Sequence, residues 1–485
     1  PGPTSVGAAR APMATSHLAA FPAPDATALL ADLHAGRLDA AALVAQHLER
    51  LTAVQPTINA AVQVFDEAAR AAAASPRPGA LSGLPVSIKE TFDLAGCRIT
   101  AGSRVMTPIE SAGDAVAVQR LKDAGAIVLA RGNVPEFAMA AETENPRYGR
   151  SANPLAPDRT CGGSSGGDAA LVAAGAVAAG LGSDILGSIR IPAAFCGLVG
   201  FKPASGAVDK GGMWPDIPEL FANSWLAAGP LARSVRDVRL LYGVLADRPA
   251  PAPAPASGLR LVIPEGFPWR SRDGAISVAL TAARKELLAR GLREERHVLG
   301  DVHDWYRTMT GLLGYELLPE LRRGLQGPDG RRFSVAAESC RRMGGRGRLY
   351  GGLYRLLLLA PLLRYHRRET FDRGVIRIES ARRDVHRLLG EDGVLLLPTI
   401  GTLAPRHGEM NRLSFRPGLN PFMTPTSLCN YLDLPAVTVP AWRFRDAATG
   451  LVPGITLAAA PGAEGPLLDA AAALEEGTAS HDGHA

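Results

Sequence analysis

The sequence predicts an α/β layer fold with an extensive core. One observation is composition: 47% of the 485 residues are hydrophobic and 20% are charged, which suits a folded chain and excludes a disordered polymer. A second is the alternation of amphipathic helical patterns with short apolar runs, which is typical of helices layered on a sheet. The length alone allows two or three domains.

The first third of the chain gives the clearest alternation. Residues 25–72 carry apolar side chains three and four positions apart, as helices do, and Asp25 and Asp39 stand where helix N-caps are expected. A short strand is expected to end at Lys89. The stretch "AVAVQRLKDAGAIVLA" then predicts a helix, a glycine turn and a buried strand over 126–130.

Further elements follow a segment, 153–207, that is dense in Gly, Ser and Ala. "PLARSVRDVRLLYGVLA" predicts an amphipathic helix, and "LRLVIPEG" a strand, on either side of a Pro/Ala stretch over 248–258. That stretch could separate domains or form a surface connection within one. Helical patterns continue to about residue 390, and "GVLLLPT" and "LPAVTVP" predict short buried strands.

Charge and cysteine content favour an ordinary solvated surface and a reducing compartment. The net charge is +5 and the pI about 9.1, a weak excess that includes Arg-rich stretches at 341–348 and 364–368. A solvated surface is the preferred interpretation over a nucleic-acid or lipid contact. The cysteines are odd in number, widely spaced and without a C-x-x-C pair, so neither a disulfide framework nor a zinc site is predicted: Cys97, Cys161, Cys196, Cys340 and Cys429.

Two segments bear on targeting and membranes. Residues 1–17 lack the apolar core of a signal peptide, so a cytoplasmic location is expected, and Met13 is a candidate natural start. The apolar segment 349–368 has an uninterrupted run of only eight residues, 356–363, against the roughly 20 that a spanning helix needs. A buried helix is preferred, with an interfacial segment or the wall of an apolar substrate entrance as alternatives.

The glycine-rich run 162–167 admits several interpretations. A phosphate-binding loop would need a Lys after the glycines, and none follows. A flexible linker is disfavoured because structured apolar patterns lie on both sides. The G-x-S-x-G nucleophile elbow must follow a hydrophobic strand, whereas "NPLAPDRTC" precedes the run.

A fourth interpretation joins three segments: "LPVSIKETFDLAG", "CGGSSGGDAALVAAG" and "GSDILGSIRIPAAFCGLVGFKP". Together they resemble the amidase signature family, in which such blocks carry a lysine, a bridging serine and a nucleophilic serine. Weaker resemblance runs from about residue 25 to 475. The resemblance implies an amidase signature fold, a central mixed β-sheet covered by helices on both faces. It also implies one catalytic domain over 19–478, with 1–18 a disordered tail or an artificial addition and 479–485 a tail.

By position, the resemblance makes Ser188 the nucleophile that becomes acylated, Ser164 the bridging serine on a cis peptide bond, and Lys89 the base. The chemistry is independently reasonable, because a serine hydroxyl needs a base and a buried lysine can be neutral enough to serve. No histidine occurs between His47 and His297, although a distant one could fold into the site.

The resemblance also places an oxyanion hole in the backbone N–H groups of Ile185, Leu186, Gly187 and Ser188. This chain has Leu186 where the family usually has glycine, so a narrower pocket or a different backbone conformation is expected there. Asp168 likewise replaces a small residue.

Four further residues lie near the catalytic segments. Asp184 and Arg190 flank the nucleophile and are expected to give it ionic support, which overlaps with an ordinary structural salt bridge. Cys161 and Cys196 are expected to pack.

The substrate is expected to be a small amide with a hydrophobic acyl or aryl group. Within the family, the likeness is greatest to fatty acid amide hydrolases, particularly the second vertebrate form. Met139, Phe137, Trp214 and the segment 350–365 are candidate pocket walls or plain core. Esters and carbamates could use the same oxyanion chemistry.

Two other functions stay open: an amidotransferase-type subunit that delivers ammonia to a partner, and a catalytically silent binding protein. No metal, cofactor or nucleic acid is expected, and membrane contact would be at most peripheral. A homodimer is left open.

Overall fold

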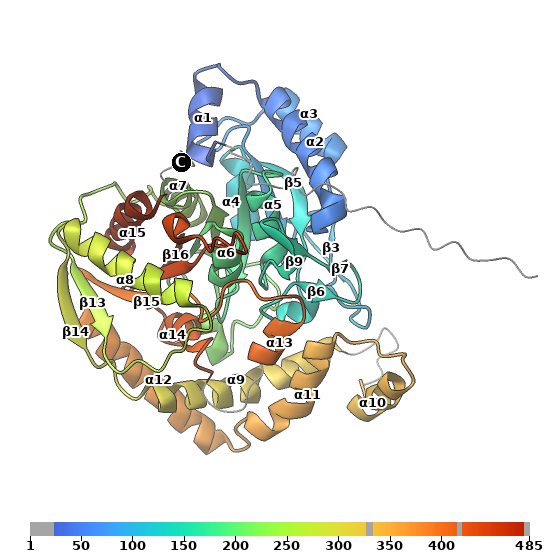
Figure 1. The fold of residues 1–485 in the computed structure, drawn as a ribbon. Coiled ribbons are helices and arrows are strands. Elements are labelled where there is room, and N and C mark those ends of the chain that lie inside the picture. Colours follow the sequence, from blue (N-terminus) through green and yellow to red (C-terminus); the bar gives the residue numbers. More distant parts are fainter. Residues whose placement is uncertain (1–23, 326–332, 415–419, 480–485) are drawn as a thin grey trace, which may run out of the picture.

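A mixed β-sheet with helices on both faces organises the chain (Figure 1). The structure, a computed structural model, describes residues 24–325, 333–414 and 420–479. Within these ranges the main sheet has 11 strands in the order β1-β5-β2-β10-β12-β11-β16-β17-β15-β13-β14. Parallel pairing joins β5, β2 and β10, and again β15, β13 and β14, while the other neighbours are antiparallel. The expected mixed α/β architecture is confirmed.

The sheet strands are β1 (Ala61–Val64), β2 (Pro85–Lys89), β5 (Ile127–Gly132), β10 (Ala179–Asp184), β11 (Val199–Lys202), β12 (Ala227–Ala232), β13 (Arg260–Pro264), β14 (Arg293–His297), β15 (Gly393–Pro398), β16 (Ala436–Pro440) and β17 (Gly454–Ala458). Small two-stranded ribbons pair β3 (Arg98–Ile99) with β4 (Ile109–Glu110), β6 (Glu144–Asn145) with β7 (Gly149–Arg150), and β8 (Ala152–Asn153) with β9 (Ala156–Thr160).

The α-helices are α1 (Ala26–His34), α2 (Ala40–Ile58), α3 (Asp66–Ala74), α4 (Val116–Asp123), α5 (Gly166–Ala173), α6 (Arg190–Cys196), α7 (Val235–Leu245), α8 (Gly274–Ala289), α9 (Val302–Gly324), α10 (Val335–Met343), α11 (Gly351–Leu363), α12 (Arg368–Leu389), α13 (Glu409–Ser414), α14 (Thr424–Tyr431) and α15 (Glu464–Thr478). None of those described is long and apolar enough to cross a membrane.

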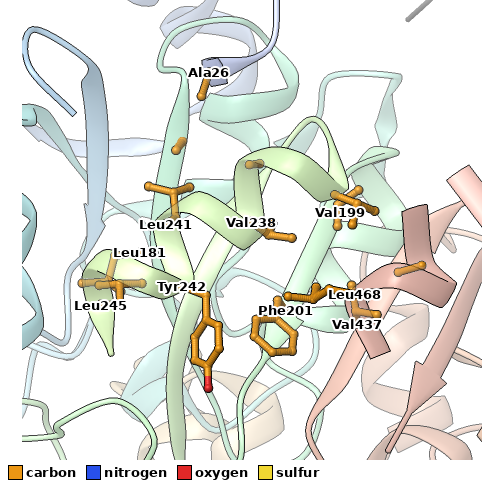
Figure 2. Packing of buried hydrophobic residues seen from close by; sticks show 14 of the residues in the cluster. Ala26, Leu181, Val199, Phe201, Val238, Leu241, Tyr242, Leu245, Val437 and Leu468 are labelled. Atoms are coloured by element: carbon orange, nitrogen blue, oxygen red, sulfur yellow. The ribbon is translucent and has the colours of Figure 1, made fainter. Parts of the chain in front are cut away.

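Alternation along β2 decides which side chains face which helices. Val86 and Ile88 join a core cluster with residues of α1, α4, α7, α8 and α15, part of which Figure 2 shows. Ser87 and Lys89 project to the opposite face because successive side chains of a strand alternate. That opposite face is covered by α5, from which Asp168 meets Ser87. A lysine is thus placed inside the protein by a strand that is buried along its whole length.

A helical layer, α9 to α12, lies between β14 and β15 in the sequence and forms the yellow and orange part of Figure 1. Its long helix α9 packs against both α12 and α11. The apolar segment expected to be a buried helix corresponds to α11, where Leu353 and Leu357 are buried and Leu358 is 44% exposed.

Several local predictions are confirmed. Asp25 and Asp39 cap α1 and α2 by accepting hydrogen bonds from the N–H groups of Ala28 and Ala42, both at 2.9 Å. The strand ending at Lys89 forms as β2, and the buried strand after the glycine turn forms as β5. The apolar runs near residues 395 and 437 form β15 and β16.

Two other predictions are wrong. Residues 61–64, expected to be helical, form the edge strand β1, and β14 interrupts the helical region expected to reach residue 390. Both β1 and β14 are short edge strands, and each pairs with a strand that is not adjacent in the local sequence pattern. The hydrophobic pattern of the segment itself therefore does not predict a strand.

The Pro/Ala stretch over 248–258 connects parts of one sheet. It lies between α7 and β13, and the strands before and after it form the two halves of one sheet, joined where β11 pairs with β16. Arg239 donates to the carbonyl of Pro251 at 3.1 Å, and the Ala254 N–H donates to Asp469 at 3.1 Å, so the stretch is fastened to the body. The expected tail 1–18 and most of the tail 479–485 lie outside the described residues.

The buried side chain of Leu457 offers a test of this core. Leu457 on β17 is fully buried between the partner positions Leu396 and Val437, so Leu457→Ala should lower the free energy of unfolding by about 2–5 kcal/mol. Chemical denaturation followed by circular dichroism measures the change. The same substitution at the exposed Leu358 is the control and should cost much less. Equal losses at the two positions would contradict the described packing.

Candidate active site

Three chain segments meet at one edge of the main sheet. Lys89 is the last residue of β2, Ser164 lies just before α5, and Ser188 lies in the turn between β10 and α6. Strands β2 and β10 are adjacent and parallel, so their carboxyl ends lie side by side. The structure therefore brings together the three residues that the sequence resemblance singled out.

The amino group of Lys89 lies within a shell of hydroxyl groups. Lys89 is fully buried, and its Nζ lies 2.7 Å from Ser164 Oγ and 2.9 Å from Ser183 Oγ. Burial lowers the pKa of Lys89 to about 7, against the opposing pull of Asp168, Asp184 and Glu90. A substantial fraction of Lys89 is therefore neutral near neutral pH, the state in which an amine accepts a proton.

The two serines lie on neighbouring loops. The Gly163–Ser164 peptide bond is cis, and the Ser165 N–H donates to the Ser188 carbonyl at 3.1 Å, which ties the loops together. Ser188 is half-buried and lines a cavity together with Gly163. Within the described ranges the Ser188 hydroxyl makes no hydrogen bond, so it is free to meet a ligand in that cavity.

Asp184 holds the turn that carries Ser188. Its carboxylate accepts from the N–H groups of Gly187 at 2.6 Å and Ile189 at 3.1 Å, on either side of Ser188. Arg190 binds both carboxylate oxygens at 3.1 Å. Burial alone would raise the pKa of Asp184. Arg190, Asn430 and Lys202 nevertheless hold this pKa below its ordinary value. Asp184 and Arg190 thus form a bidentate pair, and Asp184 also binds the turn that carries Ser188.

The backbone N–H groups of the turn that carries Ser188 differ in whether they already donate a hydrogen bond. The Gly187 N–H is engaged by Asp184, so it is not available to an oxyanion in this arrangement. The N–H groups of Leu186 and Ser188 make no hydrogen bond in the part of the chain that the structure describes. Gly187 has φ +112°, and a Cβ there would lie 2.1 Å from Thr426 Cγ2, so glycine is required at 187.

Leu186 fits without a left-handed backbone. Its side chain and that of Ile185 point into the cavity and pack against an apolar cluster that includes α9 residues. The departure from glycine at 186 therefore adds an apolar surface beside Ser188.

An apolar cavity of about 240 Å³ opens over Ser188. Its largest wall is one face of α9, whose lining residues repeat at helical spacing: Tyr306, Met309, Thr310, Leu313, Gly314, Leu317, Leu318 and Leu321. The rest of the cavity lining comes from residues 138–141, the turn that carries Ser188, α6, α11 and α14. No charged side chain is among its described lining residues, so the cavity suits an apolar group.

The sequence-predicted walls are only partly found there. Met139 lines the cavity, and Leu356 is the contribution of the segment 350–365. Phe137 and Trp214 instead pack against each other, with ring centroids 5.7 Å apart, in the cluster behind it. Sequence reasoning missed α9, because an amphipathic helix that lines a cavity has the same pattern as one that packs on a core.

Other contributors come from remote parts of the chain. Asn430 and Thr426 of α14 bind Arg190, through the Asn430 Oδ1 at 2.5 Å and the Thr426 carbonyl at 2.9 Å. They lie more than 230 positions from Arg190, so no local signal points to them. Cys161 and Cys196 are fully buried, and burial raises the pKa of Cys161 to about 12, consistent with packing.

Several known proteins match most of the length of this chain. The family model for amidases matches residues 42–468. A glutamyl-tRNA(Gln) amidotransferase subunit from Anaeromyxobacter sp. (strain K) is 34% identical over an aligned length of 484 residues, covering 92% of this chain and 94% of that protein. A solved amidase structure has a TM-score of 0.79 and 30% identity, covering 94% of this chain and all of that one.

A solved fatty acid amide hydrolase structure has a TM-score of 0.75 at 19% identity, covering 95% of this chain and 86% of that one, which shows a shared fold alone. The family match spans most of the described sheet together with the segments of Lys89, Ser164 and Ser188. The chain belongs to the amidase signature family.

Proposed function

We propose that this protein is a serine hydrolase that cleaves the C–N bond of carboxylic amides through an acyl-enzyme. Ser188 is the nucleophile, Ser164 the bridging serine and Lys89 the base. The observation that carries the proposal is the fully buried Lys89 amino group, 2.7 Å from the Ser164 hydroxyl, beside a cavity that Ser188 lines.

The proposed reaction begins with attack of Ser188 Oγ on the amide carbonyl carbon. The Ser188 proton passes to Ser164 as the Ser164 proton passes to Lys89, which becomes an ammonium. The N–H groups of Leu186 and Ser188 are the candidate donors to the oxyanion. When the C–N bond breaks, the proton returns through Ser164 to the leaving amine, and water then hydrolyses the acyl-enzyme by the same relay.

The cavity favours a substrate with an aliphatic or aryl acyl group. The α9 wall presents leucine and methionine side chains. The hydroxyl groups that line the cavity come from Tyr306, Thr310, Ser188 and Ser427. Burial of apolar surface is the main favourable contribution that such a lining can make. An ester or carbamate with the same acyl group would meet the same nucleophile.

A second candidate is an amidotransferase-type subunit that releases ammonia for a partner. The observation in its favour is the 34% identity to the glutamyl-tRNA(Gln) amidotransferase subunit from Anaeromyxobacter. Glutamine, however, carries an ammonium and a carboxylate, and burying such charges without partners is costly. Glutaminase activity that rises when a co-purifying protein is present would favour this candidate over an independent amidase.

Labelling with a fluorophosphonate probe tests the nucleophile. Intact mass should show one adduct on the wild type and none on Ser188→Ala, because only an activated hydroxyl attacks the phosphorus. Ser427→Ala, a change at another serine of the cavity, should still give the adduct. An unlabelled but folded wild type would contradict the proposal and favour a catalytically silent binding protein.

The pH dependence of that labelling tests the base. Lys89 must lose its proton to act, so the rate should rise with pH through a midpoint near 7 and level off above it, as the pKa of about 7 requires. Lys89→Met should abolish this rise, with the fold checked by circular dichroism. A wild-type rate that is constant from about pH 6 to about pH 9 would contradict the assignment.

A series of acyl p-nitroanilides tests the cavity. Each added methylene that is buried should raise kcat/KM about fourfold, from roughly 0.8 kcal/mol per CH₂, until the cavity is filled. Leu313→Phe should narrow the α9 wall and reduce kcat/KM for the longest chains while sparing the acetyl compound. A kcat/KM that falls with every added methylene would rule out the apolar acyl site.

A further inference from the structure

We propose that Asp168 is a positioning residue for the base: its buried carboxylate, held by Ser87 on the strand of Lys89, stabilises the ammonium that forms on Lys89. This inference rests on the proposed function. Asp168 belongs to the first turn of α5, four residues after Ser164. It does not touch the substrate cavity, so any effect on the reaction passes through Lys89.

The carboxylate is fixed on the face of β2 from which Lys89 projects. Ser87 donates to Asp168 Oδ1 at 2.8 Å, and both residues are fully buried. Ser87 and Lys89 are two positions apart on one strand, so their side chains point to the same side, with Cα atoms about 7 Å apart. Asp168 therefore approaches the base from the helix that covers it.

The neighbouring strands make room for this carboxylate. A Cβ on Gly132 of β5 would lie 2.3 Å from Asp168 Oδ2, and one on Gly180 of β10 would lie 3.0 Å from the Asp168 Cβ. Real Cβ atoms do not approach other atoms as closely as the first of these distances. The glycine at 132 is thus required by the presence of Asp168, which marks a built site and not a chance burial.

One carboxylate oxygen has no hydrogen-bond partner. Asp168 Oδ2 is buried and unpaired among the described residues, which is rare in folded proteins and calls for a compensating charge. The charged groups that act on Asp168 or Lys89, besides these two themselves, are Glu90 after β2, Arg131 on β5 and Asp184 on β10, which is paired with Arg190 of α6. Strands β1 and β12 contribute none.

Of the three carboxylates that raise the pKa of Lys89, Asp168 has neither a salt bridge nor a hydrogen bond from another residue's backbone N–H among the described residues, although Arg131 also acts on it. Asp184 is neutralised by Arg190, and Glu90 accepts from the N–H groups of Thr100 and Ala101. Asp168 is the leading carboxylate among those that raise the pKa of Lys89 against burial. Burial raises the pKa of Asp168 to about 7, while Ser87, Lys89 and Arg131 act to lower it.

The role follows from the proton balance. When Ser188 attacks, one proton moves through Ser164 to Lys89, so a positive charge appears on a fully buried side chain. An ionised Asp168 favours that charge, as the aspartate of a Ser-His-Asp triad favours the imidazolium. It therefore makes Lys89 a stronger base and raises the pH at which Lys89 becomes neutral.

The test compares the pH dependence of fluorophosphonate labelling in Asp168→Asn and in the wild type. The midpoint should move to lower pH by about one unit, a tenfold change in the Lys89 equilibrium, and the rate at high pH should fall. Ser87→Ala removes the hydrogen bond and keeps the carboxylate, so it should move the midpoint in the same direction by less. A purely structural role would lower the rate without moving either midpoint.

Asp469→Asn is the matched control, because Asp469 is a buried carboxylate paired with Arg239 away from the site, and its midpoint should equal that of the wild type. Unchanged midpoints in both Asp168→Asn and Ser87→Ala would overturn the inference and leave the proposed nucleophile standing. A wild type that takes no label would overturn both.

Discussion

The burial of the Lys89 amino group is the constraint on which the arrangement of the site depends. A lysine pKa near 7 in place of 10.5 corresponds to a free-energy difference on the order of 5 kcal/mol between the two protonation states. The unfolded chain binds this proton more readily than the folded one between those values. Lys89 therefore costs stability below pH 7, and the cost fades as the pH rises toward 10.5.

The surroundings of Lys89 meet that constraint with hydroxyl groups in contact and carboxylates further out. Ser164 and Ser183 give the amino group hydrogen bonds without fixing its charge. A carboxylate in direct contact would hold Lys89 permanently protonated, because an adjacent opposite charge favours the ionised form. Asp184 is kept from doing so by Arg190, which leaves it to bind the Ser188 turn.

The sequence was most informative where chemistry is confined to a short segment. The resemblance of three short segments to the amidase signature family singled out Lys89, Ser164 and Ser188, and the structure brings their segments together, while their catalytic roles stay a prediction. The strand β14, "REERH", could not be predicted from the sequence, because it is polar and is strand only through its pairing with β13. The binding of Arg190 by Asn430 was equally hidden, since tertiary packing alone brings α14 to α6.

The proposed function draws its chemistry and its selectivity from different parts of the chain. The groups assigned to the reaction lie on the sheet and the loops at its edge, while α9, from the helical layer between β14 and β15, supplies the largest wall of the cavity. A change on α9 acts on the cavity wall more directly than on Lys89, since the strand that holds Lys89 also packs on its other face against a separate core cluster. A charged acyl group would lose its hydration against α9 with no counter-charge among the described lining residues, so the proposed acyl site would exclude such a group by desolvation as well as by shape.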